Sequence, residues 1–374
     1  MIILRSSSRN YCFVLACGGA TVVACHGPTE CDEMKALYLR RPGEFDVIDR
    51  EGPISGNGDT VIRVRWSGIC ATDVATIEGI SPVAVYPMTP GHEFIGTVVT
   101  TPAAGSFRPG DWVTIYPTQG CGSCSACAAG RPNLCRGFKV YGVHRDGGSF
   151  AEMIAVASSQ LLPVPEELQN QHGALIEPVA VAVHANRRAN VAAGGHQKVG
   201  VIGLGVIGSL IAQVARARGV TDIVLADRLA SRRQLCADLG FDRFVHAADT
   251  EQLRDGLTRS GPYDLVFDNA CTPDTVRASI DSLVPGGTLI LLGFPHGGND
   301  IPLSYATAYQ RELSILLSRN YAREDFIEAI ELLRSGAIDA QRMITGTWPL
   351  EHFHDAYRSL RGEPGRHLKV LITP

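Results

Sequence analysis

The chain has few charged residues and lacks the features of a protein that binds nucleic acid or crosses a membrane. Charged residues make up 19% of its 374 positions, the formal net charge is −4, and there is no run of lysine and arginine. A mildly acidic chain without a basic cluster does not favour binding to nucleic acid or to an anionic membrane. After residue 33, no apolar run is long enough to span a bilayer. These absences leave a small molecule as the expected partner.

The cysteines do not form the pattern of a disulfide framework. The chain has eleven, of which four fall within residues 121–135 and the others are scattered or lie near the start. In a long chain, clustered thiols more often bind metal. A hydrophobic content of 45% with 40 glycines is typical of a compact α/β enzyme. Because the length exceeds what one hydrophobic core usually serves, we expect two domains.

Residues 1–33 differ from the rest of the chain. Two arginines precede an uncharged stretch, 11–25, that is short for a membrane span but long enough for the apolar part of a secretion signal. Against export, Met34 opens "MKALYLRRPGEF", which has the form of a natural start followed by a short strand and a turn. We expect 1–33 to be an N-terminal extension that is disordered or not translated, and the protein to be cytoplasmic. Export is the alternative.

The remaining sequence predicts an α/β fold made of two domains. Short alternating runs and turns predict a β-rich, barrel-like catalytic domain over 34–178, completed by 318–374. From 179 to 317, strand, glycine turn, helix and strand alternate, which predicts a doubly wound parallel sheet. Residues 323–336 carry helical spacing and end at a glycine, and 367–374 form a closing strand.

Four cysteines with the spacing C-x2-C-x2-C-x7-C predict a structural zinc site. They are Cys121, Cys124, Cys127 and Cys135. Four thiolates satisfy the tetrahedral preference of zinc and leave no open position, so such a site folds a lobe and does not catalyse. The alternative is two disulfides or a redox pair.

A second, open metal site is a hypothesis built from residues that are distant in sequence. Its candidates are Cys70 in "GICATD", His92 and Glu93 in "GHEF", and Glu177 in "LIEP". Each alone has an ordinary explanation: a buried cysteine, a core histidine, or a turn. Together, a thiolate, an imidazole and a carboxylate suit a zinc ion that keeps a position for water or substrate.

The string "GLGVIG" predicts a dinucleotide site. Gly203, Gly205 and Gly208 follow the strand "KVGVI" and, with Val206 and Ile207, open an apolar-striped helix. This arrangement brings a pyrophosphate to the helix N-terminus. Asp227 ends the next strand, where a carboxylate accepts ribose hydroxyls and favours NAD, whereas the adjacent Arg228 weakens that preference. The alternative is a set of ordinary turns in an α/β sheet.

Taken in order, these motifs resemble those of the zinc-dependent medium-chain dehydrogenases, the family of alcohol, sorbitol, threonine and L-galactonate dehydrogenases. The resemblance covers essentially everything from Met34 onward. It implies a GroES-like catalytic domain with a Rossmann cofactor domain, two zinc ions per chain, NAD, and a homodimer or homotetramer. It also implies that Cys70, His92 and a glutamate hold the catalytic zinc. Whether Glu93 or Glu177 binds directly stays open.

The sequence departs from the family at the proton relay. Many relatives carry a histidine five residues after the metal cysteine, but that position is Ala75 here. Thr72 remains, and its hydroxyl can accept the alcohol proton. Asp73 is expected to orient His92 or the loop from behind the metal ligands. The predicted reaction is hydride transfer from a secondary alcohol to NAD+.

The substrate is less well defined than the reaction. The stretch "YGVHRDGGSFAEM" resembles relatives that act on polyols, sugar alcohols and sugar acids, so His144 or Arg145 could reach the cleft, or could lie on a solvated loop. Arg319 could contact cofactor or a substrate carboxylate, or form a structural ion pair between domains. The alternatives are a threonine-type or simple secondary-alcohol dehydrogenase and, further off, a catalytically silent NAD-binding protein.

Overall fold

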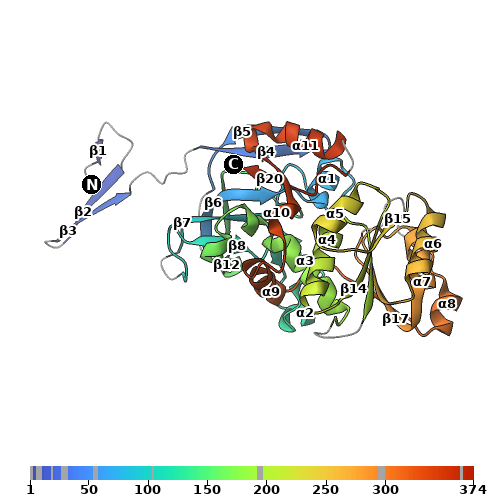
Figure 1. The fold of residues 1–374 in the computed structure, drawn as a ribbon. Coiled ribbons are helices and arrows are strands. Elements are labelled where there is room, and N and C mark those ends of the chain that lie inside the picture. The colour runs from blue at the N-terminus through green and yellow to red at the C-terminus, as the bar shows by residue number, and fades with distance from the viewer. Residues whose placement is uncertain are drawn as a thin grey trace.

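The computed structural model describes residues 3–5, 11–17, 20–26, 33–53, 58–102, 105–191, 197–293, 300–362 and 365–374. Two large sheets organise this part of the chain (Figure 1). One is mostly antiparallel and the other is entirely parallel, as the sequence predicts.

The antiparallel sheet has seven strands within the described residues. Their order is β12-β8-β7-β6-β20-β19, with β11 paired to β6. The strands are β6 (Asp59–Gly68), β7 (Glu93–Thr100), β8 (Trp112–Ile115), β11 (Met153–Ala157), β12 (Leu161–Pro163), β19 (Ile344–Pro349) and β20 (Lys369–Thr373). Since β20 pairs with β6, the C-terminal end of the chain closes the catalytic sheet.

The strand β6 lies at the centre of this sheet, and most of its residues are buried. Val61, Ile62 and Val64 are buried in one core with Phe94 and Met153 from its partner strands. Before these strands in the chain, β4 (Met34–Arg41) and β5 (Glu44–Arg50) form a hairpin. Smaller elements complete this half: β9 (Thr118–Gln119), β10 (Lys139–Val140), α1 (Ala71–Ile77), α2 (Ser125–Ala128), α10 (Ala340–Met343) and α11 (Phe353–Gly362).

The parallel sheet carries six strands in the order β15-β14-β13-β16-β17-β18 among the described residues. They are β13 (Lys198–Ile202), β14 (Asp222–Asp227), β15 (Phe244–His246), β16 (Tyr263–Asp268), β17 (Leu283–Leu291) and β18 (Ser314–Leu317). The helices between them are α4 (Val206–Ala217), α5 (Arg232–Asp238), α6 (Thr250–Ser260), α7 (Pro273–Ser282) and α8 (Tyr305–Gln310). The strand order reverses between β13 and β16, where a doubly wound sheet binds its ligand.

Two helices lie between the sheets (Figure 1). α3 (Ile176–Arg188) packs against α4 on one side and α9 (Arg323–Arg334) on the other. Nδ1 of His184 on α3 lies 2.8 Å from Oδ2 of the fully buried Asp325 on α9, and Nη2 of Arg187 lies 3.0 Å from the same oxygen. Because Asp325 is buried, this polar network holds the two helices in one register.

Three short strands occupy the first part of the chain. β1 (Ile3–Arg5), β2 (Tyr11–Cys17) and β3 (Ala20–His26) pair in an antiparallel sheet. The other residues before Glu33 lie outside the described residues, so the expectation for 1–33 stays a prediction. No helix in the described part of the chain is long and apolar enough to cross a membrane.

Candidate active site and metal centres

Cys70 and Asp73 are fixed by the first turn of α1. Cys70 is the N-cap of that helix, and its backbone N–H donates to Oδ2 of Asp73 over 2.8 Å. The other carboxylate oxygen, Oδ1, lies 3.4 Å from Nδ1 of His92. Asp73 is fully buried, so its carboxylate joins the cysteine loop to the histidine ring and leaves Nε2 of that ring for another partner.

His92 enters the site through a turn that only glycine allows. Gly91 has φ +105°, and a Cβ on it would lie 2.7 Å from Oγ of Ser149. Burial lowers the pKa of His92, but Asp73 and the neighbouring Cys70 outweigh burial and hold the pKa well above its ordinary value. A metal ion that binds this ring would have to compete with a proton.

Glu93 begins β7 and forms a buried ion pair with Lys369 of β20. The side chains of the two residues are only 2% and 3% exposed, and Nζ of Lys369 also donates to the carbonyl of Ile69 over 3.0 Å. Glu93 faces Gly68 across the sheet, where any Cβ would collide with its carboxylate. The sequence analysis missed both Lys369 and Gly68; the available signal was a lone lysine in the apolar strand "LKVLI".

Three of the four predicted donors come together. Ligand atoms of Cys70, His92 and Glu93 lie within 4.8 Å of one another, and Glu177 is not in that group. Glu177 is buried at the start of α3, with the hydroxyl of Tyr321 beside its carboxylate. Burial, together with the charge of Glu93, raises the pKa of Glu177 to about 7, although His92 opposes the shift. Glu177 is therefore a neighbour of the donor group, and it holds a proton more readily than an ordinary glutamate does.

The donor chemistry fits zinc. One thiolate, one imidazole and one carboxylate make a mixed set that leaves a fourth position open, as catalytic zinc sites do. Thr72 lies half-buried on the same turn as Cys70, and its side chain forms no hydrogen bond within the described part of the chain.

The cysteine quartet forms a second donor set. Sulfur atoms of all four lie within 4.8 Å of one another, and none is in a disulfide. Hydrogen bonding from the backbone and hydroxyl of Ser123 lowers the pKa of Cys121 to about 6, and the backbone of Cys127 lowers that of Cys124. Cys127 differs: a backbone hydrogen bond from Gly122 opposes the shift, but burial and the other three thiols raise its pKa to about 11. Only a cation would let all four become thiolates together, which fits a structural zinc ion.

The glycine loop has the shape that a dinucleotide needs. Gly203 has φ +88° after β13, and Gly205 is the N-cap of α4. A Cβ on Gly208 would collide with the carbonyl oxygen of Gly203, so the helix and the strand can pack this closely only with glycine. At Gly205 a Cβ would meet nothing within 4 Å, which leaves room above the helix N-terminus for a phosphate. Val206 and Ile207 form the first turn of α4.

Asp227 lies at the end of β14, where its carboxylate is fixed by the backbone. Oδ2 accepts from the N–H of Leu204 over 2.7 Å, and Oδ1 accepts from Leu229 over 2.8 Å. Arg228 is exposed, whereas burial lowers the pKa of Arg232 and Asp227 partly restores it. The arginine whose pKa responds to Asp227 is therefore Arg232, which was not singled out from the sequence.

The three side chains considered for the substrate are in different surroundings. Arg145 donates from Nη1 to Oε1 of Gln119 over 3.0 Å and lies over the Tyr141 ring, so it has its own partners. His144 and Arg319 both pack on Phe138. The charges of His92 and Arg319 both act on His144, which puts His144 on the same side of the molecule as the metal donors.

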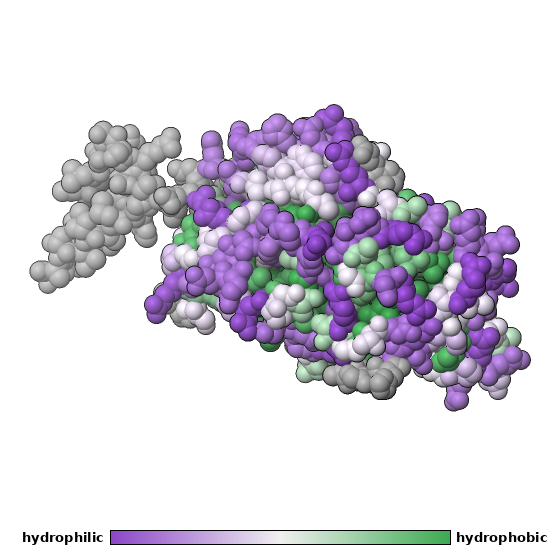
Figure 2. All heavy atoms as spheres, viewed as in Figure 1, coloured by the Kyte–Doolittle hydropathy of each residue, from purple (hydrophilic) through white to green (hydrophobic). Residues whose placement is uncertain are grey.

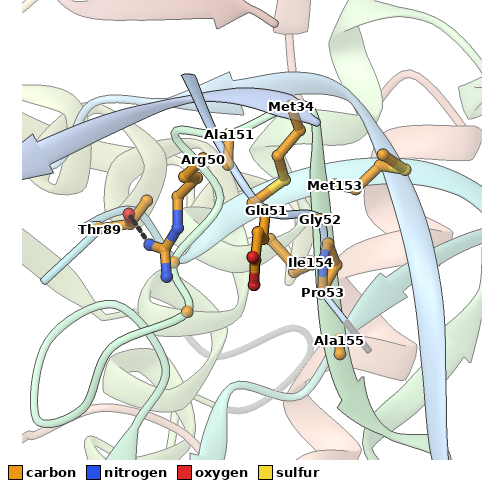
Figure 3. A pocket seen from close by; sticks show the side chains of 12 residues that line it. Met34, Arg50, Glu51, Gly52, Pro53, Thr89, Ala151, Met153, Ile154 and Ala155 are labelled. Carbon is orange, nitrogen blue, oxygen red and sulfur yellow. Dashed lines mark hydrogen bonds between the residues drawn. The ribbon is translucent and has the colours of Figure 1, made fainter. Parts of the chain in front are cut away.

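A cavity of about 550 Å³ lies elsewhere on the catalytic half (Figure 3). Met34, Met153 and Ile154 supply apolar walls, and Arg50 donates to Oγ1 of Thr89 over 3.1 Å at its edge. None of the metal donors lines it. This cavity therefore does not coincide with the donor groups.

Comparisons with known proteins agree with this geometry. The family model described as "Alcohol dehydrogenase GroES-like domain" matches residues 56–166, and the model described as "Zinc-binding dehydrogenase" matches 206–335. The chain is 32% identical to L-galactonate-5-dehydrogenase of Escherichia coli K12, over 87% of this chain and 94% of that protein. It is 31% identical to a sorbitol dehydrogenase of Halalkalibacterium halodurans, over 91% and 99%. A crystal structure of the alcohol dehydrogenase rspB of E. coli CFT073 with NADH superimposes with a TM-score of 0.85 at 28% identity, covering 92% of this chain and 100% of that one.

Proposed function

The chain belongs to the zinc-dependent medium-chain dehydrogenase/reductase family, and from this premise we propose that it oxidises a secondary hydroxyl of a polyol, sugar alcohol or sugar acid with NAD+. The observation that carries the proposal is the buried donor group of Cys70, His92 and Glu93, whose ligand atoms lie within 4.8 Å of one another. Relatives named for L-galactonate and sorbitol support the class of substrate. The NADH in the similar rspB structure supports the cofactor.

Each residue of the site has a proposed role. Cys70, His92 and Glu93 would hold a zinc ion, which when bound supplies a Lewis acid that lowers the pKa of a substrate hydroxyl. Asp73 lies 3.4 Å from Nδ1 of His92 and would orient the ring so that Nε2 is left for the metal. Thr72 lies on the same turn with a free hydroxyl and would accept the proton that the substrate releases.

The cofactor side is argued from the glycine loop and the acid after it. Gly203, Gly205 and Gly208 would cradle the pyrophosphate at the start of α4, and Asp227 would accept the ribose hydroxyls. NAD+ supplies the hydride acceptor. The two halves of the chain would hold substrate and nicotinamide in reacting geometry, which is where much of the rate enhancement arises.

Metal content and substrate oxidation test this proposal together. We expect two zinc ions per chain, and NADH formation with at least one compound in a panel of polyols, aldonates, threonine and simple secondary alcohols. Cys70→Ala should lose one zinc ion and the activity. Cys236→Ala is the matched control, because Cys236 is a buried cysteine on α5 outside both donor sets and should lose neither. One zinc ion per chain with no NADH from any alcohol would contradict the proposal.

We also propose that the protein is a homodimer that extends its parallel sheet through β18. This edge strand ends at Leu317, which is 70% exposed, and Tyr309 on the neighbouring α8 is 74% exposed. Figure 2 shows hydrophilic and hydrophobic residues mixed over the face that it presents. Large apolar side chains exposed at a sheet edge favour pairing with another chain. Light scattering should give twice the chain mass for the wild type and a monomer for Leu317→Lys. A wild-type monomer would contradict this assembly.

A cytoplasmic location is proposed as well. All seven cysteines whose side chains are described are free thiols, and metal donor sets of this kind need reduced sulfur. Sequencing the N-terminus of the cellular protein tests this location. A chain that begins at Met34 supports it, whereas a chain processed near Cys25 and recovered outside the cytoplasm contradicts it.

A further inference from the structure

Arg319 carries a guanidinium that has no acidic partner in the part of the chain that the structure describes. It follows β18 and stands two residues before Tyr321, whose hydroxyl lies beside Glu177. The charges of Arg319 and His92 both act on His144, so Arg319 and the donor group lie close to the same histidine. Within the described residues Arg319 forms no ion pair, whereas Arg187, Arg218 and others pair with carboxylates. Only burial acts on its pKa, which it lowers, so no nearby charge compensates the guanidinium.

Arg319 and His144 share a platform, the ring of Phe138. Cζ of Arg319 lies 4.0 Å from the centroid of that ring, and the His144 ring meets it at 4.9 Å with an interplanar angle of 63°. Nδ1 of His144 accepts from the N–H of Val140 over 3.3 Å, so the neutral ring carries its proton on Nε2. The two side chains therefore flank one ring and offer a guanidinium fork and an N–H donor.

The platform belongs to the cysteine lobe, which we define as residues 121–138. Asn133 is buried between Cys127 and Cys135, and its Nδ2 points to the carbonyl of Arg319 at 3.5 Å. The N–H of Phe138 donates to the carbonyl of Cys135 over 3.2 Å. The quartet thus fixes both the ring beneath Arg319 and a contact to its backbone, although Arg319 is more than 180 residues away in sequence.

We propose that Arg319 and His144, held on Phe138 of the cysteine lobe, form a carboxylate subsite that makes the enzyme prefer sugar acids to neutral polyols. This inference rests on the proposed function. A guanidinium binds carboxylate through two parallel N–H bonds, and the ring beneath it fixes its orientation. The guanidinium supplies the one permanent positive charge of the subsite, whereas burial and the charges of Arg319 and His92 lower the pKa of His144. One charge matches a carboxylate better than a phosphate, which carries nearly two.

A matched pair of substrates tests the role of Arg319. The compounds are an aldonate and the alditol of the same chain length and configuration, with the corresponding sugar phosphate as a third arm. Arg319→Gln should lower kcat/KM for the aldonate by about 10- to 100-fold, mostly through KM, and change that for the alditol by about twofold or less. Arg319→Lys should recover part of the loss. Arg145→Gln is the matched control: it lies one residue from His144, also stacks on a ring, and has Gln119 as its partner, so both substrates should keep wild-type values.

Three results would overturn the inference. Equal losses for aldonate and alditol in Arg319→Gln would mean a general structural role. A rise in KM for NAD+ with unchanged aldonate KM would assign Arg319 to the cofactor. A sugar phosphate with a higher kcat/KM than the aldonate, lost in Arg319→Gln, would assign the charge to phosphate.

Phe138 is tested as a positioning residue by equilibrium binding, which does not depend on turnover. Calorimetry with the aldonate should show binding about 3- to 10-fold weaker for Phe138→Leu, and near-wild-type binding for Phe138→Tyr, with two zinc ions retained in both. Unchanged binding in Phe138→Leu would overturn the platform. If no alcohol reduces NAD+ but the aldonate still binds through Arg319, the proposed function fails and the subsite stands, so the two failures are distinguishable.

Discussion

Removing Lys369 should destabilise the catalytic half far more than removing a surface lysine. In Lys369→Met the carboxylate of Glu93 stays buried without its partner, and the carbonyl of Ile69 loses a hydrogen bond of 3.0 Å. Breaking a buried pair from one side costs about 3–5 kcal/mol, because the remaining charge is neither hydrated nor paired. The matched control is Lys35→Met. Lys35 pairs with Asp49 at 3.3 Å, but the two side chains are 42% and 70% exposed, so this change should cost about 1 kcal/mol or less.

Tryptophan fluorescence can report on this half of the molecule alone. The chain has three tryptophans, and Trp66, Trp112 and Trp348 all lie in the antiparallel sheet that contains Lys369. Urea unfolding should be compared after chelation, so that no metal cation replaces the lysine. Adding Glu93→Gln to Lys369→Met should recover most of the loss, because the buried charge is then gone. The reasoning is refuted if the two lysine variants cost the same, or if Glu93→Gln makes Lys369→Met worse.

Three further outcomes are expected. Gly205→Ala should leave the melting temperature unchanged and weaken NADH binding by about tenfold or more, because the Cβ fills the space for the phosphate. Gly208→Ala should lower the melting temperature and weaken NADH binding, because its Cβ collides with the carbonyl oxygen of Gly203. If the two variants changed the melting temperature equally, this reasoning would be contradicted. Burial raises the pKa of Asp268, so the stability of the wild type should fall as the pH rises from the ordinary aspartate pKa through the raised one. The stability of Asp268→Asn minus that of the wild type should therefore be larger at pH 8 than at pH 4. A stability difference that does not change with pH would refute the assignment. Cys127→Ser should lower the zinc content from two to one per chain while NADH binding persists; retention of two zinc ions would show that the quartet does not hold the metal.

The features that the sequence predicts well are those encoded in one short stretch. The quartet spacing and the glycine loop each bring their residues together within a single turn or lobe, so local geometry fixes the outcome whatever the rest of the chain does. The two sheets follow for a similar reason, because period-two alternation and buried parallel runs differ in pattern. The grouping of Cys70, His92 and Glu93 was a hypothesis from donor types that the family resemblance supported, since no sequence spacing links the turn before α1 to the start of β7.

The surroundings of Lys369 and Arg319 could not be predicted, because they depend on which distant segments of the chain come together. Lys369 has the pattern of an ordinary strand residue until β20 pairs with β6 and carries it to Glu93. There it pairs with a carboxylate that lies beside two metal donors and that would be costly to bury without a partner. The same reasoning applies to Arg319, whose environment is set by a cysteine lobe distant in sequence. In both cases the charge comes from a segment near the C-terminus and its environment from one near the front. The site is therefore complete only when the two ends of the catalytic half have joined.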